Sequence, residues 1–147
     1  DNKLLASAGT DKAIKIWDLE DGTERTRLSG HTGPVYAVAF APNSQLVASG
    51  SWDNTLRIWD VNKSQELKML KVHEGDIWGI AFGPEGKTLA TAGQDRTSKW
   101  INIETEQTLA TFRGHGGPVH GVAVSKDGKL IATGGRDGTI RVYETPE

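Results

Sequence analysis

Apolar residues along the chain gather in short runs that are separated by glycine, proline, asparagine and aspartate. The segments 34–40, 45–51, 55–61 and 65–71 show the pattern most clearly. β-Branched and aromatic residues are frequent in these runs, and no stretch sustains the 3.6-residue periodicity of an amphipathic helix. The pattern therefore predicts an all-β chain of short antiparallel strands joined by tight turns.

The same pattern returns every 42 residues. Aspartate occupies one equivalent position in each period, at Asp11, Asp53, Asp95 and Asp137. Histidine returns with the same interval, at His31, His73 and His115. Each complete period holds four predicted strands, and the aspartate falls in the turn between the second and the third, where aspartate tolerates a tight hairpin backbone. A period of this length indicates a repeat architecture.

The repeat resembles the WD40 repeat, whose family forms β-propellers of radially arranged four-stranded blades. Gly-His and Trp-Asp pairs carry the resemblance, at Gly30-His31, Gly114-His115, Trp17-Asp18 and Trp59-Asp60. Other units depart from these pairs, with Val72-His73, Ile101-Asn102 and Tyr143-Glu144. The resemblance covers the whole chain and implies about 3.5 repeats in WD40-type blades.

Residues 1–147 are therefore expected to form one propeller segment with blades at 1–29, 30–71, 72–113 and 114–147. The first unit lacks its first strand and the last lacks its fourth, so we expect no closed ring from one chain. Two apolar blade faces would then stay exposed. Two explanations stay open: the chain is a fragment of a longer propeller, or two copies complete a ring of about eight blades.

The resemblance also implies a hydrogen-bonded tetrad within a blade, made by the histidine, a second-strand serine or threonine, the turn aspartate and a third-strand tryptophan. The second unit holds the full set, at His31, Ser49, Asp53 and Trp59. The other units hold partial sets, at Ser7, Asp11 and Trp17, at His73, Thr91 and Asp95, and at His115, Thr133 and Asp137.

Two residues place the later tetrads in doubt. Ile101 cannot donate a hydrogen bond, and whether the Tyr143 hydroxyl reaches the fourth network stays open. Trp100 precedes the tetrad position by one residue. Alternation along a strand places it on the opposite face, unless the strand slips or bulges.

Family members bind partners on the channel-facing rim of one face, the top face, so the resemblance implies a contact set in this chain. It comprises the residue before the repeated aspartate and positions at the start of each innermost strand. These positions hold Tyr36, Trp52, Asp76, Trp78, Gln94, His120 and Arg136. Tryptophan, tyrosine and arginine dominate interface hot spots because they bury much area with few rotors to freeze. For Trp52 and Trp78 the alternative is packing against a neighbouring blade.

Three motifs suggest chemistry, and each has a simpler explanation. AFGPEGKT (81–88) fits a loose phosphate-binding loop, but the equivalent segments 39–46 and 123–130 are followed by predicted strands, so we expect a hairpin turn. The recurring serine, histidine and aspartate lack a Gly-x-Ser-x-Gly elbow and recur in several units, which favours a structural role. The evenly spaced histidines would lie in separate blades, too far apart to share a metal ion.

Composition narrows the function further. The 147 residues are 36% hydrophobic and 24% charged, as expected for a soluble globular protein. A net charge of −2 gives no general attraction to nucleic acid or anionic membranes. The chain has no cysteine, no apolar run long enough to span a bilayer and no signal-peptide pattern, which favours a cytoplasmic location.

We therefore expect a non-catalytic scaffold, without cofactor or metal, that binds a protein or peptide on its top face and self-associates. Two alternatives stay open. One is an enzyme that uses Asp76 and His120 as an acid–base pair at the channel. The other is a purely structural segment of a larger propeller sensor or receptor.

Overall fold

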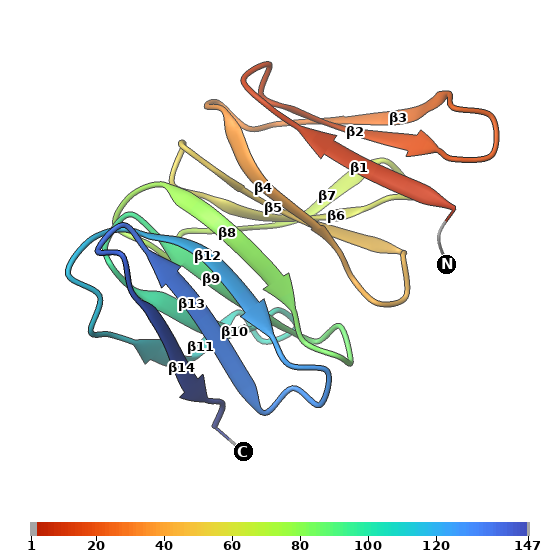
Figure 1. Cartoon of the computed structure of the whole chain (residues 1–147). Helices are drawn as coiled ribbons and strands as arrows, with labels where there is room; N and C mark the ends of the chain where they lie inside the picture. The colour runs from red at the N-terminus through yellow and green to blue at the C-terminus, as the bar shows by residue number, and fades with distance from the viewer. Residues whose placement is uncertain (1–2, 147) are drawn as a thin grey trace.

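The computed structural model describes residues 3–146, and this part of the chain forms fourteen strands in four antiparallel sheets without a helix. We call these sheets blades 1 to 4. Figure 1 shows them side by side in chain order, fanning out from the first (red) to the last (blue). The predicted all-β fold of WD40-type blades is confirmed. No helix in the described range is long and apolar enough to cross a membrane.

The strands follow each other in meander order within every blade. Blade 1 contains β1 (Leu4–Ala8), β2 (Ala13–Asp18) and β3 (Glu24–Ser29). Blade 2 contains β4 (Val35–Phe40), β5 (Leu46–Ser51), β6 (Leu56–Asp60) and β7 (Gln65–Leu70). Blade 3 contains β8 (Ile77–Phe82), β9 (Thr88–Gly93), β10 (Ser98–Asn102) and β11 (Gln107–Phe112). Blade 4 contains β12 (Val119–Val124), β13 (Leu130–Gly135) and β14 (Ile140–Glu144).

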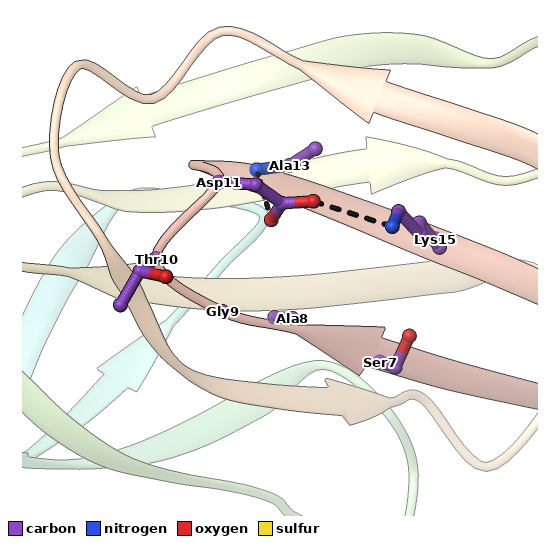
Figure 2. Close-up of a pocket in the computed structure, with 7 residues that line it drawn as sticks. All are labelled: Ser7, Ala8, Gly9, Thr10, Asp11, Ala13 and Lys15. Carbon is purple, nitrogen blue, oxygen red and sulfur yellow. Dashed lines mark hydrogen bonds and ion pairs between the residues drawn. The ribbon is translucent and has the colours of Figure 1, made fainter.

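The repeated aspartates occupy equivalent hairpin turns. The residue after each aspartate adopts a left-handed backbone, with φ of 66° at Lys12, Asn54 and Arg96 and 75° at Gly138. The aspartate side chain accepts a hydrogen bond from the backbone N–H two residues later, as Figure 2 shows for the Asp11 turn of blade 1. This local bond favours the turn over a continued strand.

The phosphate-loop motif forms a hairpin turn between β8 and β9, as the repeat predicts. The N–H of Gly83 donates to the Thr88 carbonyl over 2.9 Å, and the N–H of Gly86 donates to the Gly83 carbonyl over 3.0 Å. Gly86 has a φ of 73°, which glycine adopts at no steric cost. Since a strand follows, the segment lacks the helix N-terminus that binds phosphate in such loops.

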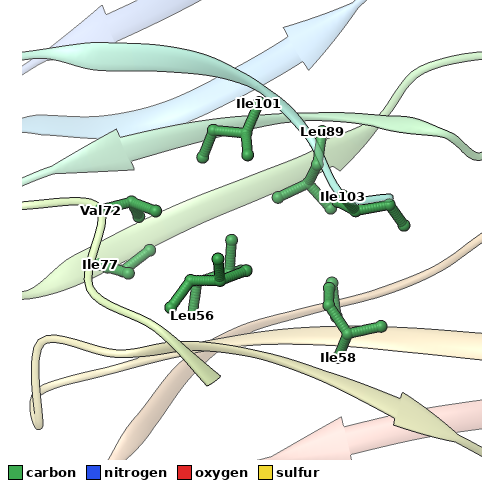
Figure 3. Packing of buried hydrophobic residues seen from close by; sticks show 9 residues of the cluster. Leu56, Ile58, Val72, Ile77, Leu89, Ile101 and Ile103 are labelled. Atoms are coloured by element: carbon green, nitrogen blue, oxygen red, sulfur yellow. The ribbon is translucent and has the colours of Figure 1, made fainter. Parts of the chain in front are cut away.

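The hydrophobic core lies in the seams between blades, with one cluster in each seam. In the seam between blades 2 and 3, Leu56 and Ile58 of β6 pack against Ile77, Leu89 and Ile101 of blade 3 (Figure 3). Successive side chains of a strand point to opposite faces, so one face of each inner blade packs on the preceding blade and the other on the following one.

Trp100 follows this rule. It packs with Ala90 and Ile131 in the seam between blades 3 and 4, whereas Ile101 faces blade 2. The register of β10 against β11 shifts between these two residues, and the same shift occurs in blades 1 and 2 at the equivalent place. The bulge is therefore a shared feature of the repeat and does not move Trp100 to the tetrad face.

The first and last blades each leave an apolar face uncovered, and the described residues form no closed ring. On blade 4, Ile140 is 80% exposed and Val142 is 60% exposed. Their equivalents in blade 2, Leu56 and Ile58, are 0% and 1% exposed because blade 3 covers them. Blade 1 exposes the large side chains of Leu5 and Leu19.

Candidate top face and hydrogen-bonded tetrads

The top face is built from the first residues of the innermost strands and from the turns that carry the repeated aspartates. In each of blades 2, 3 and 4 a backbone hydrogen bond joins the turn to the start of the innermost strand. The N–H of Trp52 donates to Pro34 over 2.9 Å, that of Gln94 to Asp76 over 2.9 Å and that of Arg136 to Pro118 over 2.8 Å. The residue before the repeated aspartate is thus held by the same backbone geometry in three successive blades.

Four residues of the predicted contact set form a continuous line, which we call the aromatic row. The ring centroids of Trp52 and Tyr36 are 6.3 Å apart, those of Tyr36 and Trp78 are 5.7 Å apart, and those of Trp78 and His120 are 4.2 Å apart. The row crosses blades 2, 3 and 4. Two tilted contacts and one edge-on contact hold the rings against one another.

Exposure differs along the row. Trp52 is 56% exposed, and Tyr36 and His120 are also exposed. Trp78 is half-buried between its neighbours, and its Nε1 donor is buried without a hydrogen-bond partner among the described residues. Trp78 thus both packs against neighbouring blades and contributes a ring to the row.

The remaining predicted contact residues lie beside the row without joining it. Gln94 and Arg136 are exposed, and no ring contact links either of them to the row within residues 3–146. Asp76 is buried, and its backbone N–H donates to Gln94 Oε1 over 3.3 Å. Burial raises the pKa of the Asp76 carboxyl above its usual value. No hydrogen bond or ion pair joins Asp76 to His120 in the described chain.

Blade 2 contains all four hydrogen-bonded side chains of the tetrad. Trp59 Nε1 donates to Ser49 Oγ over 2.8 Å, Ser49 Oγ lies 2.7 Å from His31 Nε2, and His31 Nδ1 lies 2.8 Å from Asp53 Oδ2. A carboxylate only accepts, so Nδ1 carries the proton and Nε2 accepts from the serine hydroxyl. The hydrogen bonds therefore run in one direction, from Trp59 through Ser49 and His31 to Asp53.

The surroundings of this tetrad set the charge states of His31 and Asp53. Burial lowers the pKa of His31 and outweighs the opposing effect of Asp53, which favours the neutral imidazole. Burial alone would raise the pKa of Asp53, but hydrogen bonds from Thr55, His31 and backbone N–H groups prevail and bring it to about 2. The tetrad thus pairs a neutral histidine with an ionised aspartate.

Blades 3 and 4 contain the network without its tryptophan. His73 lies 2.7 Å from Thr91 Oγ1 and 2.9 Å from Asp95, and His115 lies 2.8 Å from Thr133 Oγ1 and 3.1 Å from Asp137. The pKa values of both aspartates are far below the usual value. For Asp95 the hydrogen bonds overcome burial, and for Asp137 the hydrogen bond from Thr139 contributes most.

Tyr143 does not reach the fourth network. Its ring packs on Phe112 with centroids 4.8 Å apart, and its hydroxyl donates to the Arg113 carbonyl over 3.1 Å. The longer phenol crosses the seam to blade 3 instead of bonding to Thr133. In blade 1, Trp17 Nε1 donates to Ser7 Oγ over 2.8 Å, while Asp11 pairs with Lys15 over 3.3 Å.

A fifth member of the network is a threonine two residues after the aspartate, which sequence reasoning missed. Its hydroxyl donates to the aspartate over 2.6 to 2.8 Å and lies 3.2 to 3.3 Å from the histidine Nδ1. The positions are Thr55, Thr97 and Thr139, and blade 1 has Ala13. The sequence does carry a signal for this threonine, because it recurs with the same 42-residue interval as the aspartate.

Sequence reasoning also missed an ion pair around the tetrad of blade 2. Arg57 is buried, with its guanidinium 2.6 Å from Glu66 Oε2 and 3.6 Å from Asp53 Oδ2. The repeat carries only a partial signal for it: the positions equivalent to Arg57 hold the basic residues Lys15, Lys99 and Arg141, but those equivalent to Glu66 hold Glu24 and Thr108. The described residues hold no group of three or more histidine, cysteine or acidic side chains placed to bind a metal ion.

Comparison with known proteins places this geometry in a family. The family model described as WD domain, G-beta repeat matches residues 1–18, 22–60, 64–102 and 106–144. Coronin-7 of Rattus norvegicus is 43% identical over 42 residues, which is 29% of this chain and 5% of that protein.

Two further relatives match over a similar length. The WD40 repeat-containing protein HOS15 of Arabidopsis thaliana is 46% identical over 41 residues, 28% of this chain and 7% of that protein. The F-box-like/WD repeat-containing protein TBL1X of Mus musculus is 43% identical over 44 residues, 30% of this chain and 8% of that protein. Each alignment has about the length of one repeat and spans under a tenth of the relative. The family model covers nearly the whole chain, and the chain therefore belongs to the WD40 repeat family.

Proposed function

We propose that the chain is a non-catalytic scaffold whose top face binds a protein or peptide through the aromatic row. The observation that carries this proposal is the contact of Trp52, Tyr36, Trp78 and His120 across three blades. Large rings held against each other lose little conformational freedom on binding, which is why such residues serve as interface anchors. Protein binding is typical of the family, and no hydrogen bond or ion pair joins the acid–base candidates Asp76 and His120 within residues 3–146.

A library of random peptides displayed on phage tests this proposal. Peptides selected on the wild-type chain should bind Trp52→Ala, and the double variant Trp52→Ala/Trp78→Ala, at least about tenfold more weakly, because these substitutions remove interface anchors. Leu67→Ala/Met69→Ala is the matched control, since both residues are exposed apolar side chains of the outer strand β7. Selected peptides that bind all these variants equally well would refute the aromatic row as the binding surface.

We further propose that two copies associate through their end faces and complete a ring of about eight blades. The support is the contrast between the bare residues Ile140 and Val142 on blade 4 and their covered equivalents in blade 2. Blade 1 has Leu5, Trp17 and Leu19 on the face that points away from blade 2. Their equivalents one repeat later are Val47, Trp59 and Val61 of blade 2. Those blade 2 residues are buried in the seam that covers Ile14 and Ile16.

Mass in solution decides this second proposal. Light scattering after gel filtration should give a dimer or larger species for the wild type. Val142→Asp should shift it towards monomer, because a charge buried in an apolar seam is costly. Lys63→Asp, on an exposed turn, is the control for an added acidic charge. A wild-type chain that stays monomeric at micromolar concentration would overturn self-association without touching the top-face proposal.

A further inference from the structure

Three of the four rings of the aromatic row stand on the same irregularity of the sheet. A β-bulge interrupts the pairing of β4 with β5, of β8 with β9 and of β12 with β13, each time at the second residue of the innermost strand. The extra residues of these bulges are Tyr36, Trp78 and His120. A bulge re-aims the side chain of its extra residue, and here it does so in three successive blades.

One carboxylate belongs to the predicted contact set, and it is buried without a charged partner. Asp76 is 6% exposed. Within residues 3–146 no basic side chain pairs with it, and no other residue donates a hydrogen bond to its carboxylate. The equivalent positions of blades 2 and 4 hold Pro34 and Pro118. Since a buried carboxylate is costly unless a cation or hydrogen-bond donors accompany it, Asp76 is an acceptor still open to a ligand.

The neighbouring Trp78 lacks an acceptor in turn. Its Nε1 is buried without a hydrogen-bond partner among the described residues, and an indole N–H can only donate. Consecutive Cα atoms are about 3.8 Å apart, so the Cα atoms of Asp76 and Trp78 lie within about 7 Å of each other. An open acceptor and an open donor therefore stand within reach of one ligand.

A positive charge suits the rings as well as the carboxylate. A cation within about 6 Å of a tryptophan or tyrosine ring is attracted by the ring quadrupole. A guanidinium group also stacks on aromatic faces, and its fork of N–H groups matches the two oxygens of a carboxylate, whereas an ammonium group is a compact, strongly hydrated charge. Gln94 Oε1, which lies 3.3 Å from the Asp76 backbone nitrogen, adds a second acceptor for such a group.

The basic member of the contact set lies away from this acceptor. The N–H of Arg136 donates to the carbonyl of Pro118, two residues before His120 in blade 4. Asp76 and Gln94 belong to blade 3, and the rings of Tyr36 and Trp78 join blades 2 and 3. A bound cation is therefore expected on blades 2 and 3, where the carboxylate is and the arginine is not.

We propose that the top face recognises an arginine side chain of its protein or peptide partner. This inference rests on the proposed function of the aromatic row and names the chemistry of the partner. The guanidinium lies against the rings of Tyr36 and Trp78 and donates to the Asp76 carboxylate and to Gln94 Oε1. A main-chain carbonyl next to the bound arginine accepts from Trp78 Nε1, which is why the ligand is a peptide and not a free guanidinium ion.

A tripeptide with arginine between two alanines, acetylated and amidated at its ends, tests the proposal. Binding is followed by the indole ¹H–¹⁵N signals of the five tryptophans. We expect saturable shifts at Trp52 and Trp78, with the Trp78 proton moving downfield because its N–H gains an acceptor. Trp17 and Trp59 should not shift, since their indoles donate within their own blades. The tripeptide with uncharged citrulline in place of arginine should bind at least about tenfold more weakly.

Variants of the chain locate the cation. Asp76→Asn should weaken binding of the arginine peptide at least about tenfold, because it removes the charge that the guanidinium meets. Its urea midpoint should equal or exceed that of the wild type, since no partner is lost. Glu74→Gln is the matched control, because it removes the same charge from an exposed residue two positions away and should bind as the wild type does. Asp76→Pro, which introduces the residue of blades 2 and 4, serves if Asp76→Asn does not fold.

The outcomes separate this inference from the proposed function. Equal affinity for the arginine and citrulline peptides would overturn the inference, as would no saturable binding at millimolar arginine peptide. Undiminished binding by Asp76→Asn would overturn it as well, and a lysine peptide that binds as tightly would overturn the assignment to arginine. If peptides selected on phage still lose affinity on Trp52→Ala in these cases, the aromatic row stands as a binding surface with a different partner chemistry.

Discussion

Blades 2 and 4 are built from the same repeat, but they stand in different surroundings. In blade 2 both faces are covered by neighbours, and the chain from Trp59 to Asp53 is complete. In blade 4 the face of Ile140 and Val142 is bare, and Tyr143 bonds outside the network. The repeat thus specifies the fold of each blade, whereas the neighbours decide how much each side chain stabilises it.

The largest difference between the two blades should come from shortening equivalent apolar side chains. Ile58→Ala should lower the free energy of unfolding by about 2–5 kcal/mol, because it opens a cavity in the seam with blade 3. Val142→Ala should change it by about 0.5 kcal/mol or less at a concentration where the chain is monomeric, because this side chain is exposed. Urea unfolding followed by circular dichroism measures both values. Similar losses at low concentration would show that blade 4 is covered in the monomer.

A smaller difference should separate the two third-strand aromatic residues. Trp59→Phe removes the donor to Ser49 and should cost roughly 1–3 kcal/mol, because it leaves the buried hydroxyl with one partner fewer and reduces packing. Tyr143→Phe loses one exposed hydrogen bond and should cost less than about 1 kcal/mol. The same urea series compares them, with Trp52→Phe as a control outside any tetrad. An equal cost at both positions would mean that the tetrad adds no stability.

His31 and Asp53 of blade 2 should make the stability of the chain depend on pH in two separate ranges. The pKa of His31 is lower in the folded chain than its usual value of 6.5. The contribution of His31 to the free energy of unfolding is therefore complete above pH 6.5. It is lost as the pH falls towards the lowered pKa of the folded chain. The Asp53 pKa falls from 3.8 to about 2, so its contribution is complete above pH 3.8 and is lost as the pH falls through about 2.

The urea midpoint measured from pH 8 to pH 2 tests these signs. We expect a constant midpoint above about pH 7, a shallow fall below it and a steeper fall below about pH 4. His31→Gln should remove the shallow fall and leave the steeper one, to which Asp95 and Asp137 also contribute. A midpoint that rises between pH 7 and pH 5 would contradict the neutral state of His31.

The smallest effect on stability should come from removing an exposed charged contact at the edge of a seam between two blades. Lys68 Nζ bonds to the Glu104 carbonyl over 2.9 Å and pairs with Glu106 over 3.1 Å, which links blades 2 and 3. Blade 3 has Ala110 at the equivalent position. Lys68→Ala should cost about 0.5 kcal/mol or less, because exposed ion pairs are weak and screened by salt. A loss that does not shrink in 1 M salt would indicate packing by the lysine stem.

The strands and turns were predictable because each depends on neighbours in the sequence. The apolar runs 34–40, 45–51, 55–61 and 65–71 predicted the four strands of blade 2 to within one residue at every end. The hairpin in place of a phosphate loop at 81–88 followed from comparing the repeats. The opposite direction of Trp100 followed from the two-residue alternation of a strand.

Other features depend on distances that the repeat does not encode. The row formed by Trp52, Tyr36, Trp78 and His120 requires the spacing between blades, and so does the reach of the Tyr143 phenol to Arg113. The ion pair of Arg57 with Glu66 is of the same kind. Side-chain length and blade stagger set these contacts, and neither has a period of 42 residues.

The sequence by itself determined the family, the strand order within each blade and the residues able to form tetrads, because these follow from short-range alternation and an exact repeat. Only the tertiary structure decided which equivalent positions are covered and which are bare. Leu56 and Ile140 have the same place in the repeat, but one is sealed by a neighbouring blade and the other faces solvent. Burial is a property of the assembled blades, since it depends on what packs against a face as well as on the residues that form it.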